Sequence, residues 1–324
     1  MLFVVFLCLL LYPSKEVDMT DNPKTLKGII PPMITPLLNT NTLDKKSVEL
    51  LVEHLIKGGV NGIFILGTTG EAQHLSFSMK KELIRTTAAC VGRRVPLLVG
   101  ITDASFFESL KIADMAAENH AIALVAAPPY YFTLGQPELI EYYDALADRL
   151  PLPLYLYNMP SHTKTMIEVD TVKTLSQHQN IIGLKDSSAN GAYFCKLLHL
   201  FSHRPDFGLY VGPEEMMASM VLMGAHGGIP GGANVYPEVF VNIFNTAAAK
   251  DISKTLELQN RMIAISNELY HIGRFGSSYI KGIKTALSLK GLCGEALAQP
   301  FNRFLEPEKE KVKKAIEKLD QLYT

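Results

Sequence analysis

Ile181-Ile182-Gly183-Leu184-Lys185-Asp186-Ser187-Ser188 is an apolar run typical of a buried strand, and it carries one lysine. Lysine is seldom buried without a partner, because the loss of water disfavours its charged form. A lysine held toward neutrality is an amine nucleophile that can form a Schiff base with a carbonyl compound. The alternative for this residue taken alone is a strand-end lysine that reaches solvent or pairs with Asp186.

A second strand-like run lies upstream, Leu154-Tyr155-Leu156-Tyr157-Asn158-Met159-Pro160. An isolated Tyr157 is more often a core or interface residue than a catalyst. One strand away from a buried lysine, however, its hydroxyl could donate a proton to a carbinolamine oxygen and accept one from it. The two runs together predict proton-assisted imine chemistry.

Both runs belong to a longer alternation of short apolar runs and amphipathic segments. The strand-like runs are Gly28–Leu37, Gly62–Gly67, Val95–Ile101, Ala121–Ala127, Leu152–Tyr157, Ile181–Lys185, Gly208–Val211 and Gly227–Ile229. Helical patterns lie between them, among them Leu43–Lys57, Ser76–Cys90 and Ser105–Asn119. Apolar runs without alternation fit parallel strands that are buried on both faces. Eight β/α units in succession predict an α/β fold, a (β/α)8 TIM barrel, within the 324 residues.

The pattern becomes wholly helical after about residue 240. We therefore predict a barrel over residues 19–245 and a C-terminal helical extension over residues 246–324. Residues 2–12 form an apolar stretch that is short for a membrane span. No basic residue precedes this stretch, no small-x-small cleavage site follows it, and Met19 opens a plausible cytosolic start. We read residues 1–18 as a mis-assigned start in preference to an export leader, and expect a cytoplasmic protein.

Composition argues against several kinds of partner. The 31 basic and 32 acidic residues leave a net charge of −1, and no long basic run occurs, so we expect neither nucleic acid nor membrane as a partner. The four cysteines include no CxxC pair, which argues against a zinc site and a disulfide framework and fits a reducing compartment. The histidines show no metal-ligand spacing, and we predict surface or supporting positions for them.

Unusual polar residues gather at the predicted carboxyl ends of the strands, where (β/α)8 barrels carry their chemistry. The second strand ends in Gly67-Thr68-Thr69-Gly70-Glu71, whose backbone N–H groups and hydroxyls could converge on an anion. The loop lacks the nucleotide-binding pattern Gly-x-x-x-x-Gly-Lys-Ser/Thr, so a single carboxylate suits it better than a phosphate chain. Taken alone, Gly-Thr-Thr-Gly is more often an ordinary turn.

Three motifs in order, Gly-Thr-Thr-Gly-Glu, Tyr-Asn-x-Pro and Gly-x-Lys-Asp, resemble the dihydrodipicolinate synthase / N-acetylneuraminate lyase family of class I pyruvate-type aldolases. The resemblance covers about residues 25 to 320. It implies that the substrate is a small-molecule 2-oxo acid, with an aldehyde as the second reactant or product. It also implies no cofactor and no metal, because the covalent lysine–pyruvate imine supplies the positive charge.

The resemblance also implies a role for each matching residue. Lys185 would form the Schiff base and Tyr157 would shuttle protons, with Thr68 linking it to water. Thr68 and Thr69 would bind the carboxylate, and Gly67 would also belong to the substrate-binding residues. The backbone carbonyl of Ile229 would lie near the lysine. Tyr131 would be a fourth catalytic residue beside Lys185, Tyr157 and Thr68. It matches a tyrosine that family members insert across a dimer interface, which implies a homotetramer built as a dimer of dimers.

Comparison with the motifs of individual family members indicates which aldehyde forms the rest of the substrate. His162 stands where dihydrodipicolinate synthases have an arginine that grips aspartate semialdehyde, and histidine replaces a bidentate guanidinium poorly. Glu214 and Glu215 match acidic residues that bind a polyhydroxylated chain in sialic acid lyases, with Ser187 as a further hydroxyl. We expect cleavage of a 2-keto-3-deoxy sugar acid, or of a related 4-hydroxy-2-oxo acid, to pyruvate and an aldehyde.

Four alternatives stay open at this point. Within the family they are a dihydrodipicolinate synthase, an N-acetylneuraminate lyase and a dehydratase that uses the same imine. A different class is a non-catalytic protein that binds a 2-oxo acid, although binding alone does not need a nucleophile.

Overall fold

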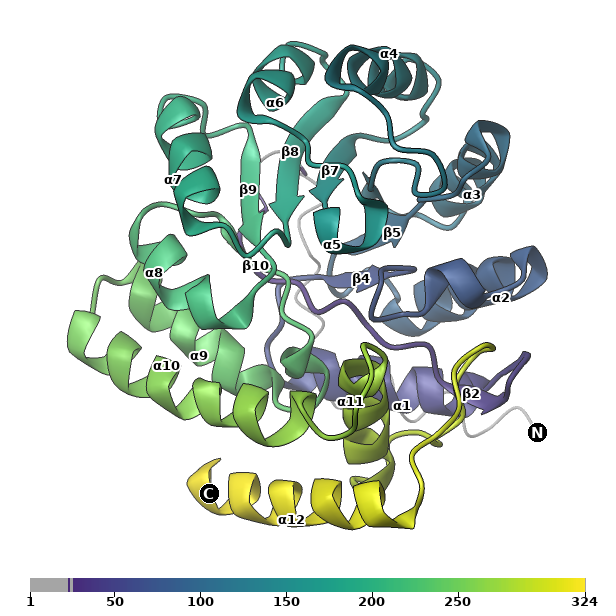
Figure 1. The fold of residues 1–324 in the computed structure, drawn as a ribbon, viewed down its shortest axis with the longest axis vertical. Helices are drawn as coiled ribbons and strands as arrows, with labels where there is room; N and C mark the ends of the chain where they lie inside the picture. The colour runs from purple at the N-terminus through teal and green to yellow at the C-terminus, as the bar shows by residue number, and fades with distance from the viewer. Residues whose placement is uncertain (1–22, 24–25, 324) are drawn as a thin grey trace.

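Eight parallel strands form one curled sheet with helices outside it (Figure 1). This computed structural model describes residue 23 and residues 26–323, so the predicted leader over residues 1–18 lies outside the described residues. The strands are β1 (Gly28–Ile29), β4 (Ile63–Ile65), β5 (Leu97–Gly100), β6 (Ala123–Ala126), β7 (Leu154–Asn158), β8 (Ile181–Asp186), β9 (Gly208–Val211) and β10 (Gly227–Gly228). The (β/α)8 prediction is confirmed.

The sheet closes through the segment that follows β1. Its order is β1-β10-β9-β8-β7-β6-β5-β4, and an isolated parallel bridge joins Pro32 to Phe64 in β4. The predicted strand Gly28–Leu37 is regular only over Gly28–Ile29, because Pro31, Pro32 and Pro36 have no N–H to donate to a ladder. The end of that run instead forms a small hairpin, β2 (Leu37–Asn39) with β3 (Thr42–Leu43), which we did not predict.

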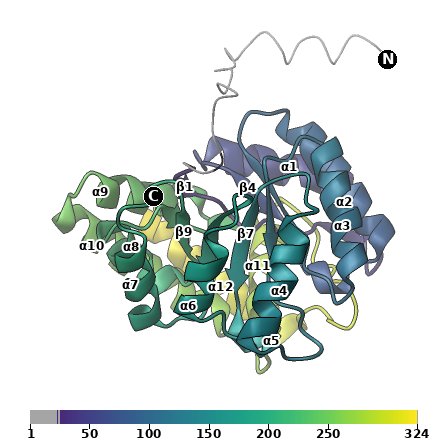
Figure 2. The same cartoon turned by 90° about the horizontal axis from the view of Figure 1, so that it is seen from above.

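A helix follows each barrel strand, and together the helices surround the sheet (Figure 2). They are α1 (Lys45–Lys57), α2 (Phe77–Val91), α3 (Phe106–Glu118), α4 (Gln136–Ala147), α6 (Val169–Leu175), α7 (Gly191–Leu200), α8 (Met217–Leu222) and α9 (Pro237–Ala248). A short helix α5 (Pro160–Thr163) comes directly after β7. Ser76 and Ser105 accept backbone N–H groups at the starts of α2 and α3, as expected of N-cap serines.

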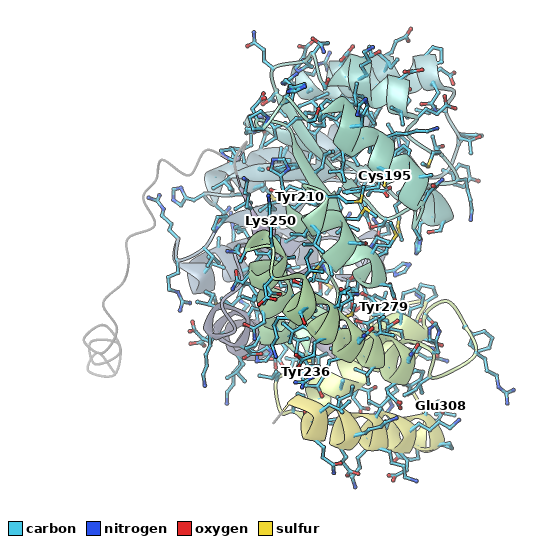
Figure 3. The ribbon with its side chains drawn as sticks, turned by 90° about the vertical axis from the view of Figure 1, so that its left-hand side faces the viewer. Cys195, Tyr210, Tyr236, Lys250, Tyr279 and Glu308 are labelled. Atoms are coloured by element: carbon cyan, nitrogen blue, oxygen red, sulfur yellow. The ribbon has the colours of Figure 1, made fainter. Side chains whose placement is uncertain are left out.

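Side chains of the strands alternate between two cores. Tyr155 and Tyr157 point inward and belong to a buried cluster in the barrel interior with Phe64 and Tyr210, whereas Leu154 and Leu156 pack outward under the helices. The hydroxyl of Tyr210, which is labelled in Figure 3, donates to the Leu26 carbonyl, and the Tyr155 hydroxyl donates to the Pro23 carbonyl. The segment before β1 therefore satisfies two buried hydroxyls of the barrel interior.

The C-terminal part is helical, as predicted. It comprises α10 (Ile252–Ile265), a π-helical turn (Ser266–Tyr270), α11 (Ser278–Leu289) and α12 (Glu306–Tyr323), with α11 between α12 and the barrel (Figure 1). The domain boundary that we placed at residue 245 falls inside the last turn of α9. In the part of the chain that the structure describes, no helix has both the length and the apolarity needed to cross a membrane.

Candidate active site

A cavity of about 520 Å³ opens at the carboxyl ends of the strands, the face where (β/α)8 barrels hold their active sites. Residues of the loops after β4, β5, β6 and β7 and of the C-terminal extension line it. The lining residues are Phe64, Leu66, Gly67, Thr68, Glu71, Gln73, His74, Thr102, Ala127, Tyr130, Tyr157, Met159, His162, Thr163, Gly276, Ser277, Ile280 and Phe301. Four predicted site residues are among them: Gly67, Thr68, Tyr157 and His162.

Lys185 lies against two of the cavity's aromatic residues. It is the register partner of Tyr157 on the adjacent strand, and its Nζ lies 4.1 Å from the centroid of the Tyr157 ring and 5.2 Å from that of Phe64. The side chain is only 4% exposed, which excludes the solvent-facing alternative. Aromatic faces attract an ammonium without holding it as firmly as a carboxylate does. An amine placed in this way is available for reaction with a carbonyl group.

Asp186 does not pair with Lys185, because its carboxylate is occupied on the other side of β8. Its Oδ1 accepts from Asn158 Nδ2 at 2.7 Å, and its Oδ2 accepts from the Ser188 hydroxyl at 2.9 Å. Burial raises the pKa of Asp186, and these hydrogen bonds oppose the rise. Asn158 also accepts from the Ile167 N–H at 3.0 Å. The Asn158–Asp186 pair thus ties β7 to β8 one residue beyond Tyr157 and Lys185.

The Thr68 hydroxyl lies 3.3 Å from the Tyr157 hydroxyl, within hydrogen-bonding distance. The loop that carries it is tightly wound: Leu66 and Glu71 both have φ of 58°, in the left-handed region that side chains other than glycine seldom adopt. The loop packs closely at Gly70, where a Cβ would lie 3.0 Å from the Met33 carbonyl oxygen. Strain of this kind persists only where surrounding contacts hold it.

Glu71 supplies the strongest of those contacts, and our sequence reasoning gave it no role. Its Oε1 lies 2.5 Å from Lys284 Nζ, and both side chains are fully buried. Its Oε2 accepts from the Ala298 N–H at 2.8 Å, while Lys284 donates to the Ala296 carbonyl at 2.7 Å. Burial lowers the pKa of Lys284, and the charge of Glu71 opposes the effect. The pair joins the threonine loop to α11 of the extension.

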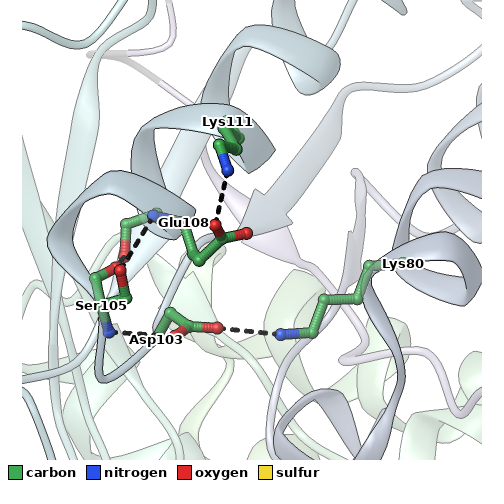
Figure 4. Close-up of polar contacts among 6 residues, drawn as sticks. Lys80, Asp103, Ser105, Glu108 and Lys111 are labelled. Atoms are coloured by element: carbon green, nitrogen blue, oxygen red, sulfur yellow. Dashed lines mark hydrogen bonds and ion pairs between the residues drawn. The ribbon is translucent and has the colours of Figure 1, made fainter.

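The loop after β5 is held by a second ion pair (Figure 4). Lys80 Nζ lies 3.2 Å from Asp103 Oδ2, with the Lys80 side chain largely buried, and Asp103 Oδ1 accepts from the Ser105 N–H. Ser105 in turn caps α3. This arrangement holds Thr102, whose hydroxyl accepts from the Ala127 N–H at 2.9 Å and so joins the β5 and β6 loops at the cavity wall.

The cavity lining includes several polar side chains and, among the described residues, no cationic one. Gln73, His74, His162 and Ser277 line the cavity, and no lysine or arginine does so among the described residues. Burial lowers the pKa of both histidines, which favours their neutral forms. The His74 ring meets Phe301 edge-on, with 4.5 Å between ring centroids. His74 is exposed, in agreement with the predicted surface position, and it also lines the cavity.

Four other predicted site residues are not among those that line the cavity. Thr69 is buried and 6% exposed, and Ile229 packs in the same interior cluster as Tyr157. Ser187 packs over Gly212, where a Cβ would lie 2.2 Å from its hydroxyl oxygen. Tyr131 is 81% exposed.

Glu214 and Glu215 form hydrogen bonds with residues of the extension and do not line the cavity. Glu214 accepts from the Tyr270 hydroxyl at 2.6 Å and from the Gly232 N–H at 2.7 Å, and burial raises its pKa to about 7. Glu215 accepts from the Ser266 hydroxyl at 2.5 Å. The motif match placed these acids beside the substrate, but their oxygens are directed toward the π-helical turn that follows α10.

Three cavity residues carry no signal in the sequence. Ser277, Ile280 and Phe301 come from the extension, far along the chain from the barrel strands, and nothing in their local sequence marks them. Gln73 and His74 could have been found, because they directly follow the Gly-Thr-Thr-Gly-Glu motif. No group of three or more His, Cys, Asp or Glu side chains placed to hold a metal ion occurs in residues 23 and 26–323.

Comparison with known proteins identifies a family match over nearly the whole chain. The model of the dihydrodipicolinate synthetase family matches residues 25–319. An Escherichia coli K12 protein named "Probable 2-dehydro-3-deoxy-D-pentonate aldolase YjhH" is 30% identical over 86% of this chain and 91% of its own length.

Two solved structures extend this similarity. Dihydrodipicolinate synthase from Bacteroides thetaiotaomicron is 48% identical with a TM-score of 0.88, over 90% of this chain and 98% of that one. YagE from Escherichia coli K12, a protein of the same family in complex with pyruvate, is 30% identical with a TM-score of 0.86, over 91% and 98%.

Proposed function

The chain belongs to the dihydrodipicolinate synthetase family, and we infer that it is a class I, Schiff-base aldolase that cleaves a 2-keto-3-deoxy sugar acid, or a related 4-hydroxy-2-oxo acid, to pyruvate and an aldehyde. The main support for this reaction class is the position of Lys185. Its side chain is buried, its Nζ lies 4.1 Å from the centroid of the Tyr157 ring, and no carboxylate among the described residues pairs with it. The name of YjhH supports a sugar acid as the substrate.

In this proposal the first step is attack of the neutral Lys185 amine on the C2 carbonyl of the 2-oxo acid. The carbinolamine oxygen takes one proton from Tyr157 and a second from the lysine nitrogen and leaves as water, which produces a protonated imine and the Tyr157 phenolate. Thr68, 3.3 Å from the Tyr157 hydroxyl, can relay protons between that tyrosine and the water of the cavity. The substrate carboxylate binds at the Gly67–Thr69 turn, where backbone N–H groups and hydroxyls are available.

The carbon–carbon bond then breaks because the imine is an electron sink. Tyr157 takes the proton of the C4 hydroxyl, the C3–C4 bond breaks with its electrons held as an enamine, and the aldehyde leaves. Protonation of the enamine at C3 and hydrolysis of the imine release pyruvate and restore the free Lys185 amine. The water released when the imine forms is replaced by the water that hydrolyses it, so the net reaction needs no other reactant.

The side chains that line the cavity favour a neutral aldehyde over one that carries a carboxylate. Gln73, His74, His162 and Ser277 offer hydrogen bonds to hydroxyl groups, while no lysine or arginine stands there in the described part of the chain to pair with a second carboxylate. We assign Glu214 and Glu215 a structural role, since their partners lie in the extension.

Dihydrodipicolinate synthase is the second candidate, favoured by the name of the 48% identical Bacteroides protein. Its condensation of pyruvate with aspartate semialdehyde would need another group to replace the arginine that His162 replaces. N-acetylneuraminate lyase and dehydratase activities use the same imine.

We further propose a cytoplasmic homotetramer. The exposed Tyr131 and Phe132, which meet edge-on with 5.2 Å between centroids, offer an aromatic pair for a dimer interface. The three described cysteines, Cys90, Cys195 and Cys293, are free, which supports a reducing compartment.

One pair of measurements tests the function. Incubation with pyruvate followed by borohydride reduction should add one pyruvate to Lys185, as mapped by mass spectrometry, and K185R should give no adduct although it keeps the positive charge. Pyruvate release from 2-keto-3-deoxygluconate should then exceed condensation with aspartate semialdehyde. No adduct on Lys185 overturns the mechanism, a preference for the semialdehyde selects the second candidate, and an adduct without turnover of any substrate indicates a binding protein.

A further inference from the structure

The turn that precedes α11 borders the cavity on the side of the extension. Gly276 and Ser277 of this turn line the same cavity as Thr68 and Tyr157, so one space reaches from the proposed reacting centre to the extension. The cavity volume of about 520 Å³ falls within the range of about 300–1,000 Å³ that is typical of small-molecule sites. Pyruvate, a three-carbon acid, would fill only part of it. The remaining space is available for the aldehyde portion of a longer substrate.

Gly276 is a glycine that the fold does not require. A Cβ atom added to it would meet no atom within 4 Å, and its φ lies outside the left-handed region that favours glycine. The glycines after β10 differ, since a Cβ at Gly231 would lie 1.6 Å from one tyrosine hydroxyl oxygen and a Cβ at Gly232 would lie 2.2 Å from another. Glycine gives the unfolded chain more freedom than alanine does, which destabilises the fold. We therefore look for its benefit in the open space that it leaves beside the cavity, which any larger side chain would reduce.

Ser277 carries a hydroxyl that the helix does not use. It is the N-cap residue of α11, where a serine side chain commonly accepts a backbone N–H, but its backbone is helical and its side chain makes no such bond. The turn is instead fixed by Ser278, whose hydroxyl accepts from the Phe275 N–H at 3.3 Å. The helix itself is anchored by Lys281 Nζ, which donates to Asn302 Oδ1 at 2.9 Å. Ser277 is therefore held at the cavity with its hydroxyl available for a ligand.

We propose that Gly276 and Ser277 form a subsite that selects the length of the substrate: Gly276 leaves room for the far carbons of the aldehyde, and the Ser277 hydroxyl bonds to a hydroxyl group on them. This inference rests on the proposed function and narrows it. The substrate is a 2-keto-3-deoxy sugar acid of six or more carbons, and short 4-hydroxy-2-oxo acids without far hydroxyl groups are poor substrates. The far end of the chain is uncharged, since no lysine or arginine among the described residues lines the cavity. The extension thereby determines which aldehyde is released, while the barrel carries out the reaction.

Two substrates of different length test this inference. 2-Keto-3-deoxygluconate has six carbons and carries hydroxyl groups at its far end, whereas 4-hydroxy-2-oxopentanoate has five carbons and ends in a methyl group. In the wild-type protein kcat/KM for the longer acid should exceed that for the shorter acid by at least about 10-fold, which one or two hydrogen bonds to its hydroxyl groups provide. The C4 epimer 2-keto-3-deoxygalactonate is assayed as well, so that stereochemistry is not mistaken for length.

Variants of the turn assign the preference to it. G276V should lower kcat/KM for the longer acid about 10- to 100-fold, because its side chain takes the space of the far carbons, and should change that for the shorter acid less than about 3-fold. S277A should lower kcat/KM for the longer acid about 3- to 10-fold, the value of one hydrogen bond, and leave the shorter acid unaffected. Pyruvate trapping on Lys185 by borohydride should stay at the wild-type level in both variants, since neither residue takes part in imine formation. G276A should keep the melting temperature or raise it slightly.

F275V provides the matched control. It places the same side chain at the neighbouring position of the turn, where Phe275 is 74% exposed and does not line the cavity. F275V should leave the ratio of the two kcat/KM values unchanged. Equal losses for both acids in G276V, or no loss for the longer acid, would overturn the proposal. A wild-type protein that forms the pyruvate adduct but does not prefer the longer acid would overturn it too, whereas failure to form the adduct would instead contradict the proposed function.

Discussion

The carboxylate of Glu71 and the ammonium of Lys284 form an ion pair, with 2.5 Å between Oε1 and Nζ, and neither side chain is exposed to solvent. Glu71 ends the threonine loop of the barrel, and Lys284 lies in the middle of α11. Glu71 Oε1 has no other compensating donor among the described residues, so the pair is the contact on which its buried charge depends. The helical extension is thus attached to the active-site loop itself.

Breaking this pair should be costly. We expect E71Q or K284M to lower the free energy of unfolding by about 3–5 kcal/mol, because either change leaves the partner's charge buried and uncompensated. The double variant should lose less than the sum of the two losses. Urea unfolding measures these values. K111A, which breaks the exposed pair with Glu108 seen in Figure 4, should change stability by less than about 1 kcal/mol. Equal effects of K284M and K111A would refute the assignment.

Tyr157 should be essential for turnover and dispensable for folding. Y157F removes the hydroxyl that gives and takes protons at the imine and at C4, and we expect kcat to fall about 10²- to 10⁴-fold. T68V, which removes only the relay, should cause a smaller loss. Stopped-flow or coupled assays of pyruvate release measure kcat, and thermal melting checks the fold. A Y157F variant with nearly normal kcat would remove Tyr157 from the mechanism.

His162 should determine whether the enzyme prefers a neutral or a charged aldehyde as its substrate. H162R places a bidentate guanidinium in the cavity, and we expect kcat/KM for aspartate semialdehyde to rise about 10- to 100-fold, the value of a hydrogen bond to a charged group. H162K should gain less, because an ammonium pairs as a point charge. Activity on the sugar acid should fall in both variants. No gain in H162R would show that His162 does not face the aldehyde.

Glu214 should make stability fall as pH rises. Its pKa is raised from 4.5 to about 7, so the folded protein keeps a proton that the unfolded chain releases between those pH values. The stabilisation from the neutral carboxyl is fully present below pH 4.5 and is lost as pH rises through about 7. Relative to E214Q, which cannot titrate, the wild-type protein should lose up to about 3 kcal/mol over this range. Parallel stability curves from urea unfolding of the two proteins would contradict the shift.

Tyr131 should matter for assembly. Native mass spectrometry should show a tetramer for the wild-type protein and smaller species for Y131A, because the exposed aromatic pair with Phe132 would bury its apolar surface against a partner. F275A removes an equally exposed aromatic side chain from another loop and should leave the assembly unchanged. A tetramer that persists in Y131A would place the interface elsewhere.

The barrel was predictable because its signal is local. Runs such as Ile181–Lys185 are apolar throughout, which only strands covered on both faces tolerate, and their order along the chain dictates a parallel sheet. Ser76 and Ser105 likewise mark helix starts through contacts with residues three positions away. The hairpin β2–β3 was missed because its strands are two and three residues long and carry no alternating pattern.

The sequence by itself determined the barrel and the family, and it marked the residues that we propose for the reacting centre, since Lys185, Tyr157 and Thr68 lie in motifs attached to strand ends. Only the tertiary structure decided what surrounds that centre. Ser277, Ile280 and Phe301 line the cavity from the extension, and the Glu71–Lys284 pair joins that extension to the threonine loop. Glu214, which its motif associates with the substrate, is directed to Tyr270 instead. Contacts between distant segments depend on how helices pack on the closed barrel, and no local pattern records that packing.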